Sequence, residues 1–85
     1  MPEPIRDYII TGHTLGEMSR RGLDESTLRQ VMINPEQRHN VRLGRDVLQA
    51  RIEFGPELYL LRVFVDVERS PAEVVTVYRT SKIAK

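Results

Sequence analysis

The sequence predicts an α+β domain in which two N-terminal helices pack on a four-stranded antiparallel meander sheet. Apolar residues recur at helical spacing between His13 and Asn34, whereas from Asn40 onward they alternate with polar residues, as they do in strands. The connections between the predicted strands are short, and short loops join antiparallel neighbours. A chain of 85 residues builds one modest core, so we expect a single domain over residues 1–85.

The first predicted helix begins near Thr11 or Thr14, because either hydroxyl can accept a hydrogen bond from a free amide at a helix start. Leu15 and Met18 lie three positions apart and form a short apolar stripe. Gly22 suits the left-handed conformation in which many helices end. We therefore expect a helix of about two turns before a glycine stop.

The second predicted helix begins after Asp24, whose carboxylate is a good N-cap. Its apolar residues fall on one face: Leu28, Val31 and Met32. A proline disfavours helical geometry in the residue before it, so Pro35 predicts a stop near Ile33.

Four strands are expected over 38–43, 47–54, 58–66 and 74–78. The second alternates apolar and polar residues, which gives it one solvent-facing side. Gly44 and the pair Gly55-Pro56 are turn signals on either side of it. The last two strands are rich in β-branched residues and are predicted to form the buried centre of the sheet. With both helices on one sheet face, the other face remains open.

Composition excludes several classes of function. The chain has no cysteine, its two histidines are far apart, and it has neither a phosphate loop nor a hydrolase nucleophile motif, so we predict no metal and no cofactor. Without a signal peptide or a long apolar run, we expect a cytoplasmic protein with no membrane partner. Net charge is only +1, but eleven of the thirteen basic residues are arginine, which suits phosphate contacts or, alternatively, reflects genome composition.

His13 and Arg62 stand out as candidate site residues. His13 lies near a helix N-terminus, which favours the neutral imidazole that acts as a base; the alternative is an ordinary polar residue near a cap. Arg62 lies within an apolar strand, where its positive charge is costly unless a partner compensates it. The two alternatives are an ion pair with Asp66 or Glu53 and a role in binding an anion.

The last strand carries a row of hydroxyl groups. Strand alternation places Thr76, Tyr78 and Thr80 on one face and Arg79 on the other. Hydroxyl groups facing Arg62 would form a polar patch of phosphate size.

Four segments together resemble a known family: 13–24 (HTLGEMSRRGLD), 31–35 (VMINP), 61–63 (LRV) and 75–78 (VTVY). The sequence resembles the bacterial domain-of-unknown-function family 4258, which is similar in layout to the RelE-like and BrnT-like ribonuclease toxins. That resemblance implies metal-independent RNA cleavage by attack of a ribose 2′-OH on the adjacent phosphate. One departure is Glu17, where family members often have arginine; we expect it to pair with Arg20 or Arg21.

The resemblance implies His13 as base, Arg62 as the cation for the phosphorane charge, and Tyr78 or Arg79 as acid. The further binding residues expected are Arg21, Thr76, Arg79, Thr80 and Lys82. The alternative function is a non-catalytic RNA-binding or protein-binding module. Expected partners are therefore RNA, an antitoxin-like protein, or a second copy of the chain, since the strand at 58–67 could expose an apolar face.

Overall fold

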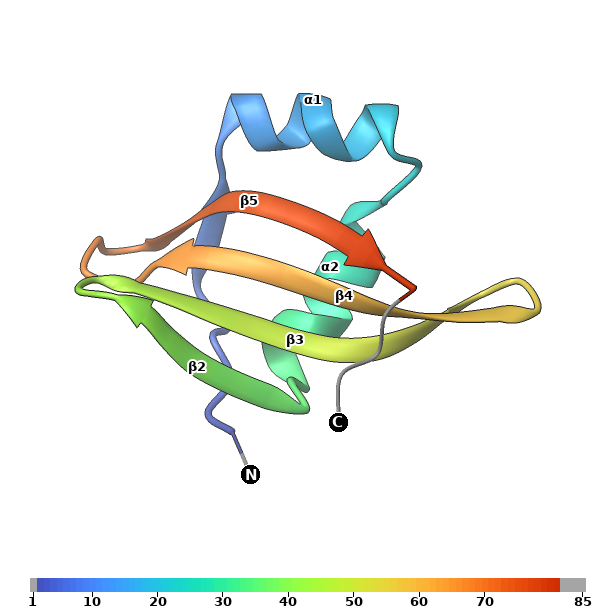
Figure 1. Ribbon diagram of the computed structural model, residues 1–85. Coiled ribbons are helices and arrows are strands. Elements are labelled where there is room, and N and C mark those ends of the chain that lie inside the picture. Colours follow the sequence, from blue (N-terminus) through green and yellow to red (C-terminus); the bar gives the residue numbers. More distant parts are fainter. Residues whose placement is uncertain (1, 82–85) are drawn as a thin grey trace.

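The computed structural model describes residues 2–81, and Figure 1 shows their arrangement. The elements in chain order are β1 (Tyr8–Ile10), α1 (Gly12–Arg20), α2 (Glu25–Ile33), β2 (Gln37–Arg42), β3 (Arg45–Phe54), β4 (Glu57–Asp66) and β5 (Ala72–Thr80). The α+β class predicted from sequence is confirmed, and the four predicted strands correspond to β2 through β5.

The sheet has five strands in the order β1-β5-β4-β3-β2, so the prediction of a four-stranded, wholly antiparallel sheet is wrong. The extra strand, β1, runs parallel to β5 and places Tyr8 beside Ala72 and Ile10 beside Val74. Three residues are too few to show an alternating pattern, which is why the sequence did not reveal this strand. The other pairings are antiparallel and follow the predicted meander.

Both helices begin at side-chain caps. Of the two candidates for α1, Thr11 is the N-cap, and its hydroxyl accepts a 3.2 Å hydrogen bond from the amide of Thr14. Asp24 caps α2 as predicted, accepting from the amide of Thr27 at 2.8 Å. Hydrogen bonds from the hydroxyl and the amide of Thr27 lower the pKa of Asp24.

Helix ends also follow the sequence. Gly22 adopts a positive φ of 68° just after α1, and α2 stops at Ile33. The predicted apolar stripe on α1 is only half right, because Met18 is buried whereas Leu15 is 41% exposed. Thr14 is buried in place of Leu15. Thr14 and Met18 are four positions apart, so they share the helix face that meets the sheet.

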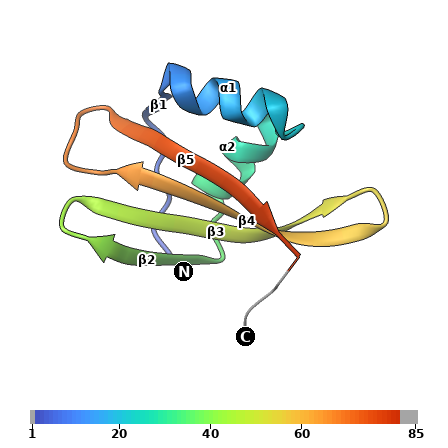
Figure 2. The same cartoon turned by 45° about the horizontal axis from the view of Figure 1, so that its top comes forward.

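The main core lies between the helices and one face of the sheet (Figure 2). Helix α1 packs along β5, and α2 packs behind β3 and β4. Strands β3 and β4 continue beyond their neighbours as a long hairpin, visible in Figure 1. Its turn contains Gly55 at a φ of 62°.

The second face of the sheet carries no helix, yet parts of it are buried. Val47 and Leu60 are 2% and 8% exposed, and the amide side chain of Gln49 lies beside them at 8%. We call this surface the open face; it carries much of the candidate site.

Candidate functional site

A row of hydrogen bonds crosses the open face through one registered position on each of four strands. Gln37, Gln49, Arg62 and Tyr78 are direct cross-strand neighbours. Gln49 donates its amide to the side-chain oxygen of Gln37. Arg62 donates Nε to Gln49 Oε1 at 3.0 Å and Nη1 to Tyr78 Oη at 2.6 Å. We call these four residues the polar ladder.

Two aromatic rings lie next to the guanidinium of the ladder. Phe64 and Tyr78 stack with centroids 5.9 Å apart and planes 18° apart. The Arg62 guanidinium carbon lies 5.3 Å from the Phe64 centroid and 5.6 Å from that of Tyr78. Cation–π attraction and two hydrogen bonds therefore compensate this charge within the strand.

Of the two alternatives for Arg62, the ion pair with Asp66 or Glu53 is not formed, because the guanidinium bonds instead to Gln49 and Tyr78. Asp66 instead accepts a 2.7 Å hydrogen bond from Arg45. Arg62 and Asp66 are four positions apart on one strand, so their Cα atoms are about 13 Å apart. Each side chain has a partner on an adjacent strand that is much closer. Neutral partners on adjacent strands lie nearer to the guanidinium than either carboxylate.

A hollow of about 620 Å³ opens between the end of α1 and β5. Its lining residues are Arg20, Arg21, Thr76, Tyr78 and Arg79. We call it the arginine hollow. Three arginines and two hydroxyl-bearing residues line the hollow and no carboxylate does, which is a composition suited to a phosphate.

A smaller hollow of about 210 Å³, the histidine hollow, lies along the same helix. Its lining residues are His13, Thr14, Glu17, Arg21, Val75, Thr76 and Val77. Arg21 and Thr76 line both hollows, so the two adjoin. His13 is exposed at the second position of α1, where its ring is accessible from solvent.

Arg21 joins the helix to the sheet. Its Nη1 donates to the carbonyl oxygen of Val77 at 2.8 Å, and its Nη2 lies 3.2 Å from Glu17 Oε1. Glu17 also forms an ion pair with Arg20, so the expected pairing of Glu17 is confirmed. The Glu17 carboxylate holds both arginines near the mouth of the hollow and neutralises part of their positive charge.

Arg79 is held from the other side by the long hairpin. Its guanidinium carbon lies 4.8 Å from the Phe54 centroid and 4.9 Å from that of Tyr59. The two rings meet edge to face at 5.6 Å. The hydroxyl of Tyr59 donates to Glu57, and this hydrogen bond raises the pKa of Tyr59. Arg79 is thus oriented by the two rings, and no residue within 2–81 accepts a hydrogen bond from its guanidinium.

The structure brings the predicted residues together only in part. Those lining the arginine hollow are Arg21, Thr76, Tyr78 and Arg79. His13 lines the adjoining hollow, and Arg62 lines neither but is bonded to Tyr78. Thr80 pairs with Leu60 at the end of β5, and Lys82 lies outside the described residues.

Sequence reasoning missed Arg20, Gln37 and Gln49. The arginine was noticed only as a helix-end residue, and the glutamines become partners of Arg62 through strand register. Counting back from a two-residue turn at Gly55-Pro56, with Phe54 opposite Glu57, places Gln49 opposite Arg62. The predicted strand start at residue 58 shifts this count by one residue, so the sequence analysis did not find Gln49.

Within residues 2–81 no three histidine or carboxylate side chains gather closely enough to hold a metal ion. No helix in the same range is long and apolar enough to cross a membrane. Comparisons with protein-family models, with curated proteins and with solved structures gave no match.

Proposed function

We propose that this chain is a toxin-like, metal-independent RNA endonuclease that binds the scissile phosphate in the arginine hollow. The observation that carries the proposal is the convergence of Arg20, Arg21 and Arg79 with two hydroxyl side chains around one hollow. Arginine forks match the geometry of phosphate oxygens and remain charged at every physiological pH. The resemblance to the ribonuclease-toxin layout adds to this argument.

The adjoining hollows supply the other groups that the reaction needs. His13 takes the proton of the ribose 2′-OH, and the resulting oxygen attacks phosphorus. Arg21, shared by both hollows, stabilises the added negative charge of the phosphorane. Tyr78 gives its proton to the departing 5′-oxygen as the P–O bond breaks. The products are a 2′,3′-cyclic phosphate and a 5′-hydroxyl, and the proton on His13 returns to the phenolate through solvent.

In this proposal Arg62 is a positioning residue. It donates a hydrogen bond to Tyr78 Oη, so the phenolic proton is directed away from the guanidinium. The polar ladder therefore holds the hydroxyl of Tyr78, the acid, in place. Arg21 takes the role of phosphorane cation that the resemblance assigned to Arg62.

The test is cleavage of a labelled single-stranded RNA by the full chain in the presence of EDTA. We expect cleavage to persist in the chelator and to leave cyclic phosphate ends. Replacing one general acid or base should slow the reaction roughly 100-fold or more, so we expect losses of that size for His13→Ala and Tyr78→Phe.

Matched substitutions separate chemistry from folding. His39→Ala changes the other histidine, and Tyr8→Phe removes a hydroxyl on the helix side of the sheet. Both should cleave at the wild-type rate. If wild type leaves every RNA intact, the endonuclease proposal is wrong. If the His13 and His39 variants cleave equally fast, His13 is not the base.

A second candidate is an RNA-binding module without catalysis. The position of Arg62 favours this candidate. Its guanidinium is hydrogen-bonded to Gln49 and Tyr78 and lines neither hollow, so it is not placed to contact a phosphate there. Binding without cleavage, with an affinity that falls steeply as salt rises, would support this candidate.

A further inference from the structure

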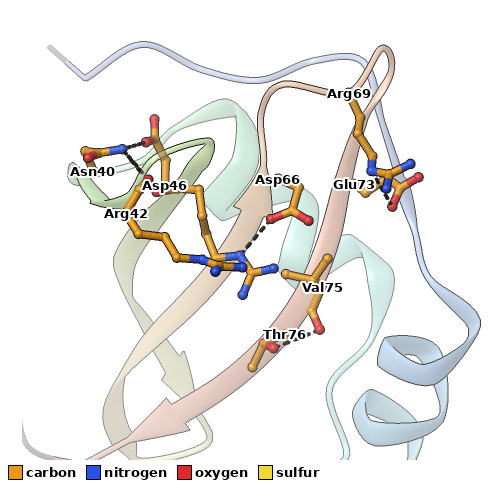
Figure 3. A network of polar contacts seen from close by, with 9 residues as sticks. Asn40, Arg42, Asp46, Asp66, Arg69, Glu73, Val75 and Thr76 are labelled. Carbon is orange, nitrogen blue, oxygen red and sulfur yellow. Dashed lines mark hydrogen bonds and ion pairs between the residues drawn. The ribbon is translucent and has the colours of Figure 1, made fainter.

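A second group of arginines surrounds Asp66 near the tight turn between β2 and β3 (Figure 3). Arg45 Nε donates to Asp66 Oδ1 at 2.7 Å. This hydrogen bond lowers the pKa of Asp66, and the charges of Arg45, Arg42 and Arg69 lower it further. We call Arg42, Arg45 and Arg69 with Asp66 the Asp66 cluster.

Carboxylates are interspersed among the three arginines of the cluster. Asp66 accepts from Arg45, Glu73 lies 3.6 Å from Arg69, and the Glu68 carboxylate lies against Gly44 in the turn. The cluster therefore has no large excess of positive charge, and Arg42 is the member that distinguishes it. The exposed guanidinium of Arg42 makes no hydrogen bond or ion pair within residues 2–81. One fork of donors is therefore available to an anion.

The backbone that carries Arg42 is firmly held. The side-chain amide of Asn40 donates to the carbonyl oxygens of Arg42 at 2.8 Å and Arg45 at 3.2 Å. The carbonyl oxygen of Gly44 accepts a 2.9 Å hydrogen bond from Val67. Figure 3 shows Asn40 beside the turn and the Arg42 side chain extending toward Asp66. A fixed turn limits the entropy lost when Arg42 binds a ligand.

The cluster lies on the open face, to which the arginine hollow extends through Thr76 and Tyr78. Asp66 is four positions from Arg62 on β4, so the cluster and Tyr78 are about 13 Å apart along the strands. Phe64 and its cross-strand neighbour Thr76 occupy the interval between them. A cation at each end and an aromatic ring between them are the features with which proteins bind single-stranded nucleic acid.

We propose that the Asp66 cluster is a second phosphate site for the backbone of a single-stranded RNA whose scissile phosphate occupies the arginine hollow. This inference rests on the proposed function and adds the substrate class. Single strands fit because their bases are free to stack on Phe64, whereas a duplex keeps its bases internal. Arg42 makes the contact, and Arg45 is held beside it by Asp66.

The test measures binding of two RNAs by fluorescence anisotropy, using 2′-O-methyl sugars so that no nucleophile is present. One probe has about eight nucleotides and spans both sites, and the other is a dinucleotide that fills only the hollow. We expect Arg42→Ala to weaken binding of the longer probe roughly three- to tenfold and to reduce its log–log salt slope by about 0.7. Binding of the dinucleotide should not change.

Two further variants complete the experiment: one should change the affinity in the opposite direction, and the other removes the same charge at a distant position. Asp66→Asn removes the carboxylate that neutralises Arg45, so the longer probe should bind more tightly and with a steeper salt slope. Arg29→Ala removes an exposed arginine from α2, on the helix side of the sheet, and should leave both affinities unchanged.

The outcomes distinguish the two proposals. If wild type binds neither probe, the proposed function and the second phosphate site are both wrong. If wild type binds both probes, but Arg42→Ala and Arg29→Ala are equal on the longer one, only the second site is wrong. An affinity of the longer probe that does not depend on salt would also overturn the site.

Discussion

Arg62 shows how one residue can stabilise the sheet and serve a site at the same time. It lies in the middle of the central strand and spans two neighbouring strands through bonds to Gln49 and Tyr78. Gln49 is nearly buried, so a lost partner would leave its amide oxygen in a poorly hydrated position. The polar ladder is therefore both a structural element and the support of Tyr78.

A double-mutant cycle tests this coupling. We expect Arg62→Ala to lower the free energy of unfolding by roughly 1–2 kcal/mol and Tyr78→Phe by roughly 1 kcal/mol. The two losses should not add, because both variants remove the same 2.6 Å hydrogen bond, and a coupling of about 1 kcal/mol should appear in urea unfolding.

The control cycle pairs Arg62→Ala with Tyr59→Phe. The hydroxyl of Tyr59 is bonded to Glu57 on the opposite face, so these losses should be additive. A coupling near zero for Tyr78 as well would mean that the hydrogen bond to Arg62 contributes nothing to stability.

At the scale of elements, glycine conformation determines where α1 ends. Gly16 lies inside the helix and Gly22 follows it at a φ of 68°, and a Cβ added at either position would meet no atom within 4 Å. Alanine substitutions at these two glycines therefore differ in backbone conformation and not in steric contact. Gly16→Ala should raise the free energy of unfolding by roughly 0.5–1 kcal/mol, since alanine favours the helix.

Gly22→Ala should act in the opposite direction, lowering the free energy of unfolding by roughly 1–2 kcal/mol, because an alanine at positive φ is strained. Thermal and urea unfolding of the two variants side by side provide the measurement. Equal shifts of the same sign would show that the left-handed conformation of Gly22 does not control this helix end.

Elements specified by neighbouring residues were predictable, whereas those that depend on distant partners were not. Asp24 and Pro35 act on the backbone next to them, so both ends of α2 followed from sequence. Strand β1 depends on Ala72 and Val74, far along the chain, and three residues carry no detectable period. The arginine hollow likewise requires Arg21 to reach Val77, 56 positions away.

Register explains the remaining part of the site. Strand alternation correctly grouped Thr76 with Tyr78 on one face, since alternation is a local property. Neither of the two alternatives for Arg62 named Gln49 or Tyr78, because both were considered without the cross-strand spacing that places these residues beside it.

At the scale of the whole molecule, the N-terminal segment closes the fold against both layers. The amide of Ile5 donates to the carbonyl oxygen of Met32 at 2.9 Å, and Arg38 donates to the carbonyl oxygen of Glu3 at 3.0 Å. Tyr8 and Ile10 pack on the main core, while β1 pairs with the first three residues of β5. These contacts join the helical layer to both sides of the sheet.

Removing residues 2–10 should therefore destabilise the entire domain. The deletion removes Ile5, Tyr8 and Ile10, which are partly buried against the main core. A fully buried side chain of this size contributes about 1.5–3 kcal/mol, and the total stability of a domain is roughly 5–10 kcal/mol. We expect circular dichroism in urea to show a much lower midpoint or no cooperative transition. Ile9→Ser is the matched control, because Ile9 is 47% exposed on the same strand and its replacement should change stability by only about 0.5 kcal/mol. If the shortened chain unfolds at the wild-type midpoint, β1 is an appendage to a four-stranded domain, and the antiparallel meander would be the unit that folds.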